Sequence, residues 1–310
     1  MGDYTKLQKD EAAEIFDFYS LGKLTEIRAL SLGISNSNYE VNTESGHYLL
    51  KISNDKNHDQ LLKEQEILQY LKEEKFSYSL EPIKTKEGEL VYRYKEYSGV
   101  VFPFVDGIPP GPSDFTCFEI GKGLATLHKI KVNEKLRPHS EVGFGTPEIK
   151  VFVNSADCPD DFKETFLDIF PDNLEDFDEN LWQEGIIHGD LYYDNTLFDH
   201  NKLGHLLDFE QSGLGPFILD IGISMSGTCL EKGRILPELV ASYLKGYEEV
   251  RPLQGQEIEH LTDAILIGLF SIALWRIKRF KIGKLNPEMA DSYKDLLYKA
   301  YLFHHRINKK

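Results

Sequence analysis

The most informative part of this 310-residue chain is the segment 186–198, which reads IIHGDLYYDNTLF. Two apolar residues lead into His188 and Asp190, and four residues then separate Asp190 from Asn195. Thirteen residues beyond Asn195, a second apolar run ends in Asp208, within the stretch LLDFE. Short apolar runs bounded by turn residues are typical of buried strands. The sequence therefore predicts two short strands that each end in a carboxylate-rich turn.

The spacing of these polar residues suits phosphoryl transfer. In that chemistry one carboxylate accepts the proton of a substrate hydroxyl, while an amide oxygen and a second carboxylate hold Mg²⁺ on the nucleotide phosphates. The protein-kinase pattern, H-R-D-x-x-x-x-N followed by D-F-G, has the same spacing. A single Asp at a strand end is usually a turn residue, but Asp190, Asn195 and Asp208 at matched offsets argue against coincidence. A metallohydrolase with His188 and Asp190 as metal ligands is the alternative, and it is disfavoured because no second His cluster lies nearby in the sequence.

At these residues the chain resembles the aminoglycoside phosphotransferase and choline kinase-like group of small-molecule kinases. That group writes H-G-D-x-x-x-x-N and then a D-F-E-type motif. The resemblance implies a two-lobed protein-kinase-like fold and the use of ATP with Mg²⁺. It implies that Asp190 is the catalytic base, that His188 braces the loop, and that Asn195 and Asp208 are metal ligands. Glu210 is a further candidate for the metal site.

A lysine in the first third of the chain fits the same interpretation. Lys51 lies inside the apolar run YLLKI, where a charge needs a partner. In the kinase arrangement the strand lysine holds the α- and β-phosphates and pairs with a helix glutamate. Glu64 and Glu66 are the candidates, and Glu64 has the offset that the family usually shows. The alternative is that Lys51 extends its amine into solvent.

A polar loop precedes this lysine and reads LGISNSNY over residues 32–39. Its glycine permits a tight turn, and its Ser and Asn residues offer donors to phosphates. Alone it would be an ordinary polar hairpin, and it is not a Walker A loop; the resemblance implies that it covers the phosphates and that the backbone of 102–105 meets the adenine ring. The residues predicted to contact the nucleotide are Lys51, Glu64, Gly33, Ser35, Asn36, Ser37, Phe102 and Phe104.

The pattern of elements predicts an α+β fold with two lobes. The Pro- and Gly-rich stretch 106–112 follows a strand-rich region and precedes a helical one. We expect an N-terminal nucleotide-binding lobe at 1–105, with a small antiparallel sheet and one helix, and a larger, mainly helical catalytic and substrate-binding lobe at 106–310, with a hinge at about 102–107. Strands are expected at 24–32, 39–42, 47–52, 78–83, 90–97, 100–105, 185–188 and 203–209. Helices are expected at 59–73, 115–129, 161–182, 235–250, 256–280 and 287–303.

Composition excludes several classes of partner. The 35 Lys and Arg against 51 Asp and Glu give a formal net charge of −16 at pH 7, which argues against nucleic acid and anionic membranes as partners. Cys117, Cys158 and Cys229 are widely spaced, which favours a reducing compartment over a disulfide framework. The start of the chain shows no secretory signal, and the longest apolar run, 264–275, is too short to span a bilayer. We therefore expect a cytoplasmic protein that acts on a small hydroxyl-bearing molecule.

Three further patterns bear on the substrate. The stretches NSNY (36–39) and GYEEVRPL (246–253), with the early aromatic run IFDFY (15–19), resemble the bacterial homoserine kinase branch of the family. That branch typically has D-F-Y where this chain has Asp208-Phe209-Glu210, and the chain departs again at 224–229. It keeps, at Asp220, the element that braces the catalytic loop in the family.

The charged side chains do not decide which molecule accepts the phosphoryl group. The acidic tract 157–179 suits a cationic alcohol or is a solvated helical face, whereas Arg234, Arg251 and Arg276 are candidates to bind a substrate carboxylate. We predict an ATP-dependent phosphotransferase, with homoserine or a related amino alcohol as the favoured acceptor. The alternatives are an aminoglycoside, choline or other sugar or amine kinase, and a catalytically inactive ATP-binding scaffold. The scaffold is disfavoured because the chain keeps the lysine, both aspartates and the asparagine of the motifs.

Overall fold

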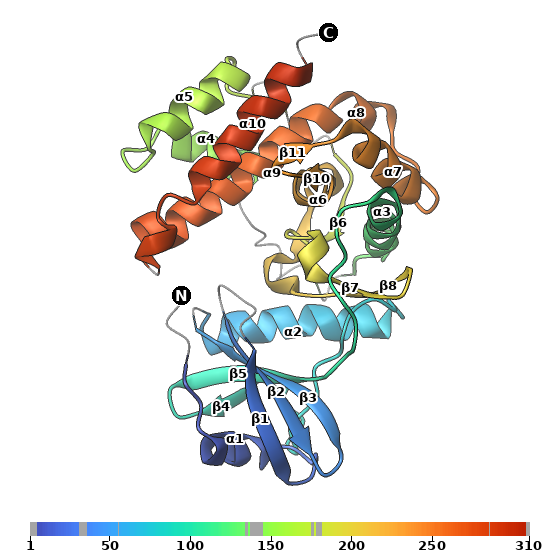
Figure 1. Cartoon of the computed structure of the whole chain (residues 1–310), viewed down its shortest axis with the longest axis vertical. Coiled ribbons are helices and arrows are strands. Elements are labelled where there is room, and N and C mark those ends of the chain that lie inside the picture. The colour runs from blue at the N-terminus through green and yellow to red at the C-terminus, as the bar shows by residue number, and fades with distance from the viewer. Residues whose placement is uncertain are drawn as a thin grey trace. The chain divides into compact units, whose positions relative to one another are not determined.

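The computed structural model describes residues 5–307 apart from 31–35, 55, 134–135, 137–144, 175–176, 178–181 and 285. The chain divides into two compact units, Met1–Asp106 and Gly107–Lys310 (Figure 1). In the part of the chain that is described, no helix is both long enough and apolar enough to cross a membrane.

The N-terminal unit is built on a five-stranded antiparallel sheet with strand order β1-β2-β3-β5-β4. Its elements are α1 (Lys9–Phe16), β1 (Leu24–Leu30), β2 (Asn36–Thr43), β3 (Gly46–Ser53), α2 (His58–Glu73), β4 (Tyr92–Tyr94) and β5 (Tyr97–Pro103). Helix α2 begins at a capping box in which the Asn57 side chain accepts a hydrogen bond from the Gln60 amide. Figure 1 shows α1 and α2 on opposite sides of this sheet.

The two faces of β3 have different environments. Leu50 and Ile52 are fully buried in a core that α1 completes with Ile15 and Phe16. Because side chains alternate along a strand, Lys51 points to the opposite face. Lys51 is only 9% exposed, so its charge lies within the protein.

The C-terminal unit is mainly helical, with three short two-stranded sheets. Its helices are α3 (Asp114–His128), α4 (Thr146–Val153), α5 (Asp160–Ile169), α6 (Phe217–Thr228), α7 (Pro237–Glu248), α8 (Gly255–Glu259), α9 (Leu261–Arg276) and α10 (Tyr293–Ile307). Its strands are β6 (Glu184–Ile187), β7 (Thr196–Asp199), β8 (Lys202–Leu206), β9 (Gly213–Pro216), β10 (Leu230–Glu231) and β11 (Arg234–Ile235). Helix α6 is buried along nearly its whole length and packs against α9, and Figure 1 shows α10 running beside α9.

The predicted fold class is confirmed, and several element boundaries are wrong. Residues 78–83 do not form a strand. The range 90–97 is not one strand, because it contains β4, the hairpin turn at Lys95 and the first residue of β5. The helix expected at 161–182 ends at Ile169, and that expected at 256–280 is interrupted at His260 and continues beyond Arg276 as a π-helix. Helices α1, α4 and α6 were not predicted, so the described part of the N-terminal unit has two helices instead of one.

Candidate functional site

The loop that carries His188 and Asp190 follows β6 and is held by a carboxylate on α6. Strand β6 pairs with β9, and Asp220 accepts hydrogen bonds from the backbone N–H groups of His188 (2.7 Å) and Gly189 (2.8 Å). Gly189 has φ +76, and a Cβ at this position would lie 2.3 Å from the carbonyl oxygen of Gln211. Only glycine fits this turn, because a side chain would be strained and would also collide with the neighbouring backbone.

The imidazole of His188 connects this loop to the segment that carries Asp208. Its Nε2 lies 2.9 Å from the carbonyl oxygen of Leu207, and its Nδ1 accepts a hydrogen bond from the Asp190 amide at 3.3 Å. A carbonyl only accepts and an amide N–H only donates, so the ring is neutral and carries its proton on Nε2. Burial lowers the pKa of His188, in agreement with a neutral ring. The His188 ring thus connects the Asp190 backbone to the Leu207 backbone, and its role as a brace of the loop stays a prediction.

Asn195 and Asp208 are brought together by the β7–β8 hairpin. Thr196 pairs with Leu206 in this hairpin, and the Leu207 amide donates to the Asn195 carbonyl at 2.8 Å. The Asn195 side-chain nitrogen donates to the backbone oxygen of Asp190 (2.7 Å) and lies 3.3 Å from its Oδ2. With the nitrogen facing Asp190, the amide oxygen is the atom that Asn195 can offer to a metal ion.

Burial and the neighbouring carboxylates raise the pKa of Asp190. Asp208 has a left-handed backbone conformation (φ 61, ψ 60), which Asp tolerates better than most residues and which is often found at functional sites. Burial is the largest cause of the raised pKa of Asp190, followed by the negative charges of Asp208, Asp194 and Glu210, and the hydrogen bond from Asn195 opposes them. Four acidic side chains thus share one region of the C-terminal unit.

This donor set fits a magnesium ion that is shared with a ligand. Carboxylate and amide oxygens are the groups that Mg²⁺ prefers, and it is usually held by one or two carboxylates together with substrate phosphates and water. Among the described residues, no group of three or more His, Cys, Asp or Glu side chains is arranged to hold a metal ion by itself. Asn195 and Asp208, with Glu210 nearby, offer the partial shell that such an ion needs.

The N-terminal unit places Lys51 and Glu64 in the positions expected for buried charges. Glu64 lies on α2 and is 6% exposed, whereas Glu66 on the same helix is exposed. The ion pair at Glu64 is formed with Lys56, whose Nζ lies 3.2 Å from Oε2. The pairing of Lys51 with Glu64 stays a prediction.

The predicted phosphate loop and adenine-binding segment are described in part. Gly33 and Ser35 lie outside the described residues. Asn36 and Ser37 begin β2 and are buried, and the Ser37 hydroxyl accepts a hydrogen bond from the Thr5 amide at 2.9 Å. Phe102 is buried in β5, and Phe104 stacks on the His47 ring, with 4.0 Å between the ring centroids.

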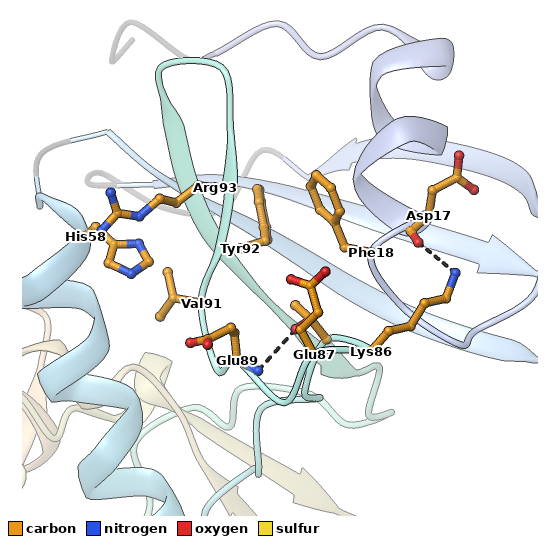
Figure 2. Close-up of a pocket in the computed structure, with 10 residues that line it drawn as sticks. Asp17, Phe18, His58, Lys86, Glu87, Glu89, Val91, Tyr92 and Arg93 are labelled. Carbon is orange, nitrogen blue, oxygen red and sulfur yellow. Dashed lines mark hydrogen bonds between the residues drawn. The ribbon is translucent and has the colours of Figure 1, made fainter.

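A cavity of about 470 Å³ lies elsewhere in the N-terminal unit (Figure 2). It is lined by Asp17, Phe18, His58, Thr85, Lys86, Glu87, Glu89, Val91, Tyr92 and Arg93. Figure 2 shows Arg93 beside His58 at one end of the cavity and Lys86 reaching the Asp17 carbonyl at the other, where the N–O distance is 2.8 Å. The lining has both acidic and basic side chains. None of the described residues that were predicted to contact the nucleotide belongs to it.

The three candidate arginines for a substrate carboxylate lie in different environments. Arg251 is buried and forms an ion pair with Glu257, so its guanidinium serves the protein core. Arg234 is exposed on β11, next to α10. Arg276, at the end of α9, lies close enough to Tyr192 for its charge to affect the Tyr192 hydroxyl, and Tyr192 is two residues from Asp190.

The chain belongs to the phosphotransferase enzyme family, whose family model matches residues 26–253. It is therefore a small-molecule phosphotransferase, a kinase of the aminoglycoside phosphotransferase type, as the resemblance of its motifs predicted.

Within this family, similar curated proteins are homoserine kinases. The homoserine kinase of Polaromonas naphthalenivorans (strain CJ2) is 26% identical over 290 residues, which cover 92% of each chain. That of Rhizobium meliloti (strain 1021) is 29% identical over 269 residues, which cover 84% of this chain and 81% of the relative. The resemblance to the homoserine kinase branch is thus confirmed.

Solved structures with the same fold include kinases for other small molecules. Spectinomycin phosphotransferase, in complex with ADP and spectinomycin, aligns with a TM-score of 0.69 over 96% of this chain and 99% of its own, at 14% identity. A microcompartment-associated aminopropanol kinase aligns with a TM-score of 0.71 over 97% of this chain and 98% of its own, at 16% identity. At these identities the alignments establish the protein-kinase-like fold.

Proposed function

We propose that this protein is an ATP- and Mg²⁺-dependent kinase that phosphorylates the hydroxyl group of homoserine or a closely related amino alcohol. The observation that carries the proposal is the arrangement of Asp190, Asn195 and Asp208 in the C-terminal unit. The homoserine kinases that are similar over most of the chain favour this acceptor.

In this proposal each polar residue of the catalytic loop has a separate task. Asp190 accepts the proton of the acceptor hydroxyl, and its raised pKa makes it a stronger base than an ordinary carboxylate. Asn195 orients Asp190 through its side-chain nitrogen and offers its oxygen to the metal. Asp208, supported by Glu210, is the carboxylate ligand. A Mg²⁺ ion held by these residues would supply positive charge to neutralise the transferred phosphoryl group.

The N-terminal unit is proposed to bind the nucleotide. Lys51 is the cation for the α- and β-phosphates, and Glu64 is its proposed partner. Gly33, Ser35, Asn36 and Ser37 are proposed to cover the phosphates, with Phe102 and Phe104 in the segment that meets the adenine ring. Spectinomycin phosphotransferase was crystallised with ADP and, separately, with AMP, which supports a nucleotide as the phosphoryl donor.

Arg276 is the proposed anchor for the acceptor's carboxylate. It is half-buried at the end of α9, and one of its N–H groups donates to the carbonyl of Ser292 at 2.9 Å. A guanidinium has five N–H donors, so this bond leaves most of its donor capacity. The neighbouring Tyr192 ring is fixed against α6, because a Cβ on Gly227 would lie 1.8 Å from it. An acceptor carboxylate at Arg276 would therefore lie beside the loop that carries Asp190.

A panel of acceptors tests the proposed function. The purified enzyme with Mg·ATP is assayed for ADP formation with homoserine, aminopropanol, choline and spectinomycin. We expect the highest kcat/KM with homoserine. Turnover confined to an acceptor without a carboxylate would contradict the assignment, and ATP binding without turnover on any acceptor would favour the inactive scaffold.

The variant Arg276→Gln tests the carboxylate anchor, with Arg234→Gln as the matched control. Loss of a bidentate charged contact costs about 2 kcal/mol, or about thirtyfold in affinity. We expect KM for homoserine to rise about thirtyfold in Arg276→Gln and to stay within twofold in Arg234→Gln. An unchanged KM in Arg276→Gln would show that another group binds the carboxylate.

A further inference from the structure

Five buried side chains of the C-terminal unit form a continuous hydrogen-bonded chain that ends at the catalytic loop. Its members, in order, are Glu257, Arg251, Tyr247, His128 and Asp220. Arg251 Nη1 donates to the Tyr247 hydroxyl at 3.1 Å, and that hydroxyl lies 2.6 Å from Nδ1 of His128. Nε2 of His128 lies 3.0 Å from Oδ2 of Asp220, the carboxylate that holds the loop amides. We call this set the Arg251–Asp220 chain.

The direction of every hydrogen bond in the chain follows from Arg251, Asp220 and a neutral His128 ring. An arginine guanidinium only donates, and an ionised aspartate only accepts, so the proton of a neutral His128 lies on Nε2 and is donated to Asp220. Nδ1 of His128 then accepts the proton of the Tyr247 hydroxyl, whose oxygen accepts from Arg251. A protonated His128 would face the Tyr247 hydroxyl with a second donor. Burial, the largest cause, lowers the pKa of His128 and keeps the ring neutral, against the opposing effect of Asp220.

Arg251 also holds the other end of the strand that leads into the loop. Its Nη2 donates to Oε1 of Gln183 at 2.6 Å and to Oε1 of Glu257 at 2.7 Å, while its Nη1 donates to Oε2 of Glu257 at 3.2 Å in addition to Tyr247. Both terminal nitrogens thus make two bonds each, which is their full capacity. Gln183 directly precedes β6, and the loop directly follows it.

Two aromatic contacts fix the geometry of the chain. The rings of His128 and Phe217 are stacked, with centroids 4.2 Å apart and planes 18° from parallel. The Arg251 guanidinium carbon lies 4.8 Å from the centroid of the same Phe217 ring. Phe217 begins α6, three residues before Asp220. The chain therefore crosses a packed site in which its members have little room to change rotamer.

We propose that Arg251 and Tyr247 are positioning residues for phosphoryl transfer: through His128 and Asp220 they set the position of the His188–Asp190 loop. In this proposal Arg251, in the stretch 251–253 (RPL), aligns the catalytic base and does not bind the substrate. The proposal rests on the proposed role of Asp190 for its effect on turnover, but the ordering of the loop amides is independent of that role.

The test is the variant Tyr247→Phe, with Tyr243→Phe as the matched control. Both tyrosines are fully buried and lie one turn apart on α7, and Tyr243 is not a member of the Arg251–Asp220 chain. Removing the Tyr247 hydroxyl breaks the chain without a large cavity. Because one net hydrogen bond corresponds to about a five- to tenfold change in rate, we expect kcat to fall five- to tenfold in Tyr247→Phe, with KM for ATP unchanged. In Tyr243→Phe, kcat should stay within twofold.

Two readouts that need no substrate separate this proposal from the proposed function. Amide hydrogen exchange at His188 and Gly189, measured by NMR on the whole protein, should accelerate at least fivefold in Tyr247→Phe and stay unchanged in Tyr243→Phe. The ¹⁵N shifts of His128 should show the Nε2–H tautomer in the parent protein and a change in Tyr247→Phe.

Three results would decide against the proposal or against its link to catalysis. Unchanged exchange at both amides in Tyr247→Phe, or equal acceleration in the two variants, would overturn it. Accelerated exchange with unchanged kcat would overturn the role of the loop's position in turnover. If Tyr247→Phe does not fold, Arg251→Lys replaces it, because lysine keeps the charge but cannot serve Tyr247, Glu257 and Gln183 together, and the same exchange pattern is expected.

Discussion

Asp190 and Asp220 lie at the two sides of one loop, and their environments have opposite effects on their charge. Burial raises the pKa of Asp190, and the neighbouring charges of Asp208, Asp194 and Glu210 raise it further. Asp220 is fully buried, which by itself would raise its pKa, but the hydrogen bonds from His128 and from the His188 amide hold that pKa below its ordinary value. One carboxylate faces other acids, and the other faces fixed donors.

The difference supports the proposal that Asp190 serves chemistry and that Asp220 serves structure. A buried charge that is fully hydrogen-bonded is stable and inert, as Asp220 is. A carboxylate among like charges gains from a proton or from a cation, and such perturbed groups concentrate at functional sites. Asp220, which holds the loop amides, thus has its charge matched by hydrogen-bond donors. Asp190, which lies on the loop, faces neighbouring negative charges.

The largest expected effect tests the reactive side of this comparison. Asp190→Asn keeps the shape of the side chain and removes the base, which is worth about 10²–10⁴ in rate. We expect kcat to fall about a thousandfold while the Kd for ATP, measured by calorimetry, changes less than threefold. Turnover within tenfold of the parent would show that Asp190 is not the base.

A second effect concerns the metal rather than the proton. Asp208→Asn removes one charged oxygen from the proposed Mg²⁺ shell, so ATP should bind about tenfold more weakly in the presence of Mg²⁺. Without Mg²⁺ the same titration should show parent-like binding. Equal weakening in both titrations would assign Asp208 to the nucleotide or to folding instead.

The third effect is on stability, and its sign differs between the two acids. Because the folded-state pKa of Asp220 is depressed, its stabilisation is present above the ordinary Asp pKa and is lost as the pH falls through the lower folded-state value. Because that of Asp190 is raised, its contribution is present at acidic pH and is lost as the pH rises through the raised value. At pH 7 we therefore expect Asp220→Asn to destabilise the protein by about 3 kcal/mol and Asp190→Asn to stabilise it by about 1 kcal/mol.

Thermal unfolding without nucleotide or Mg²⁺ measures both changes. Each kcal/mol shifts the Tm of a unit of this size by about 2–4 °C. Shifts of the same sign in the two variants would contradict the distinction between the two carboxylates. Repeating the scan at pH 4 should shrink the gain from Asp190→Asn, since the parent Asp190 is then protonated.

The sequence indicated that Asp190, Asn195 and Asp208 lie close together, because their spacing is local. Asp190 and Asn195 are connected through one short 3₁₀ turn, and a single hairpin brings Asp208 beside Asn195. The sequence predicted α6 poorly because the helix is buried on nearly all sides, which removes the alternation of apolar and exposed polar positions by which a helix is recognised. It also suggested a substrate-binding role for Arg251, since an arginine in a motif shows its charge but not its partners.

The sequence by itself therefore determined the family, the two-part α+β organisation and the identity of the residues that face one another across one turn or one hairpin. Only the tertiary structure decided which charges are satisfied. His128, Asp220, Tyr247 and Arg251 span more than a hundred residues, and their hydrogen bonds arise because α3 packs against α6, α7 and β6. The burial of a carboxylate and its hydrogen-bond partners depend on contacts between segments that are distant in the sequence. These contacts give Asp220 and Asp190 their different environments.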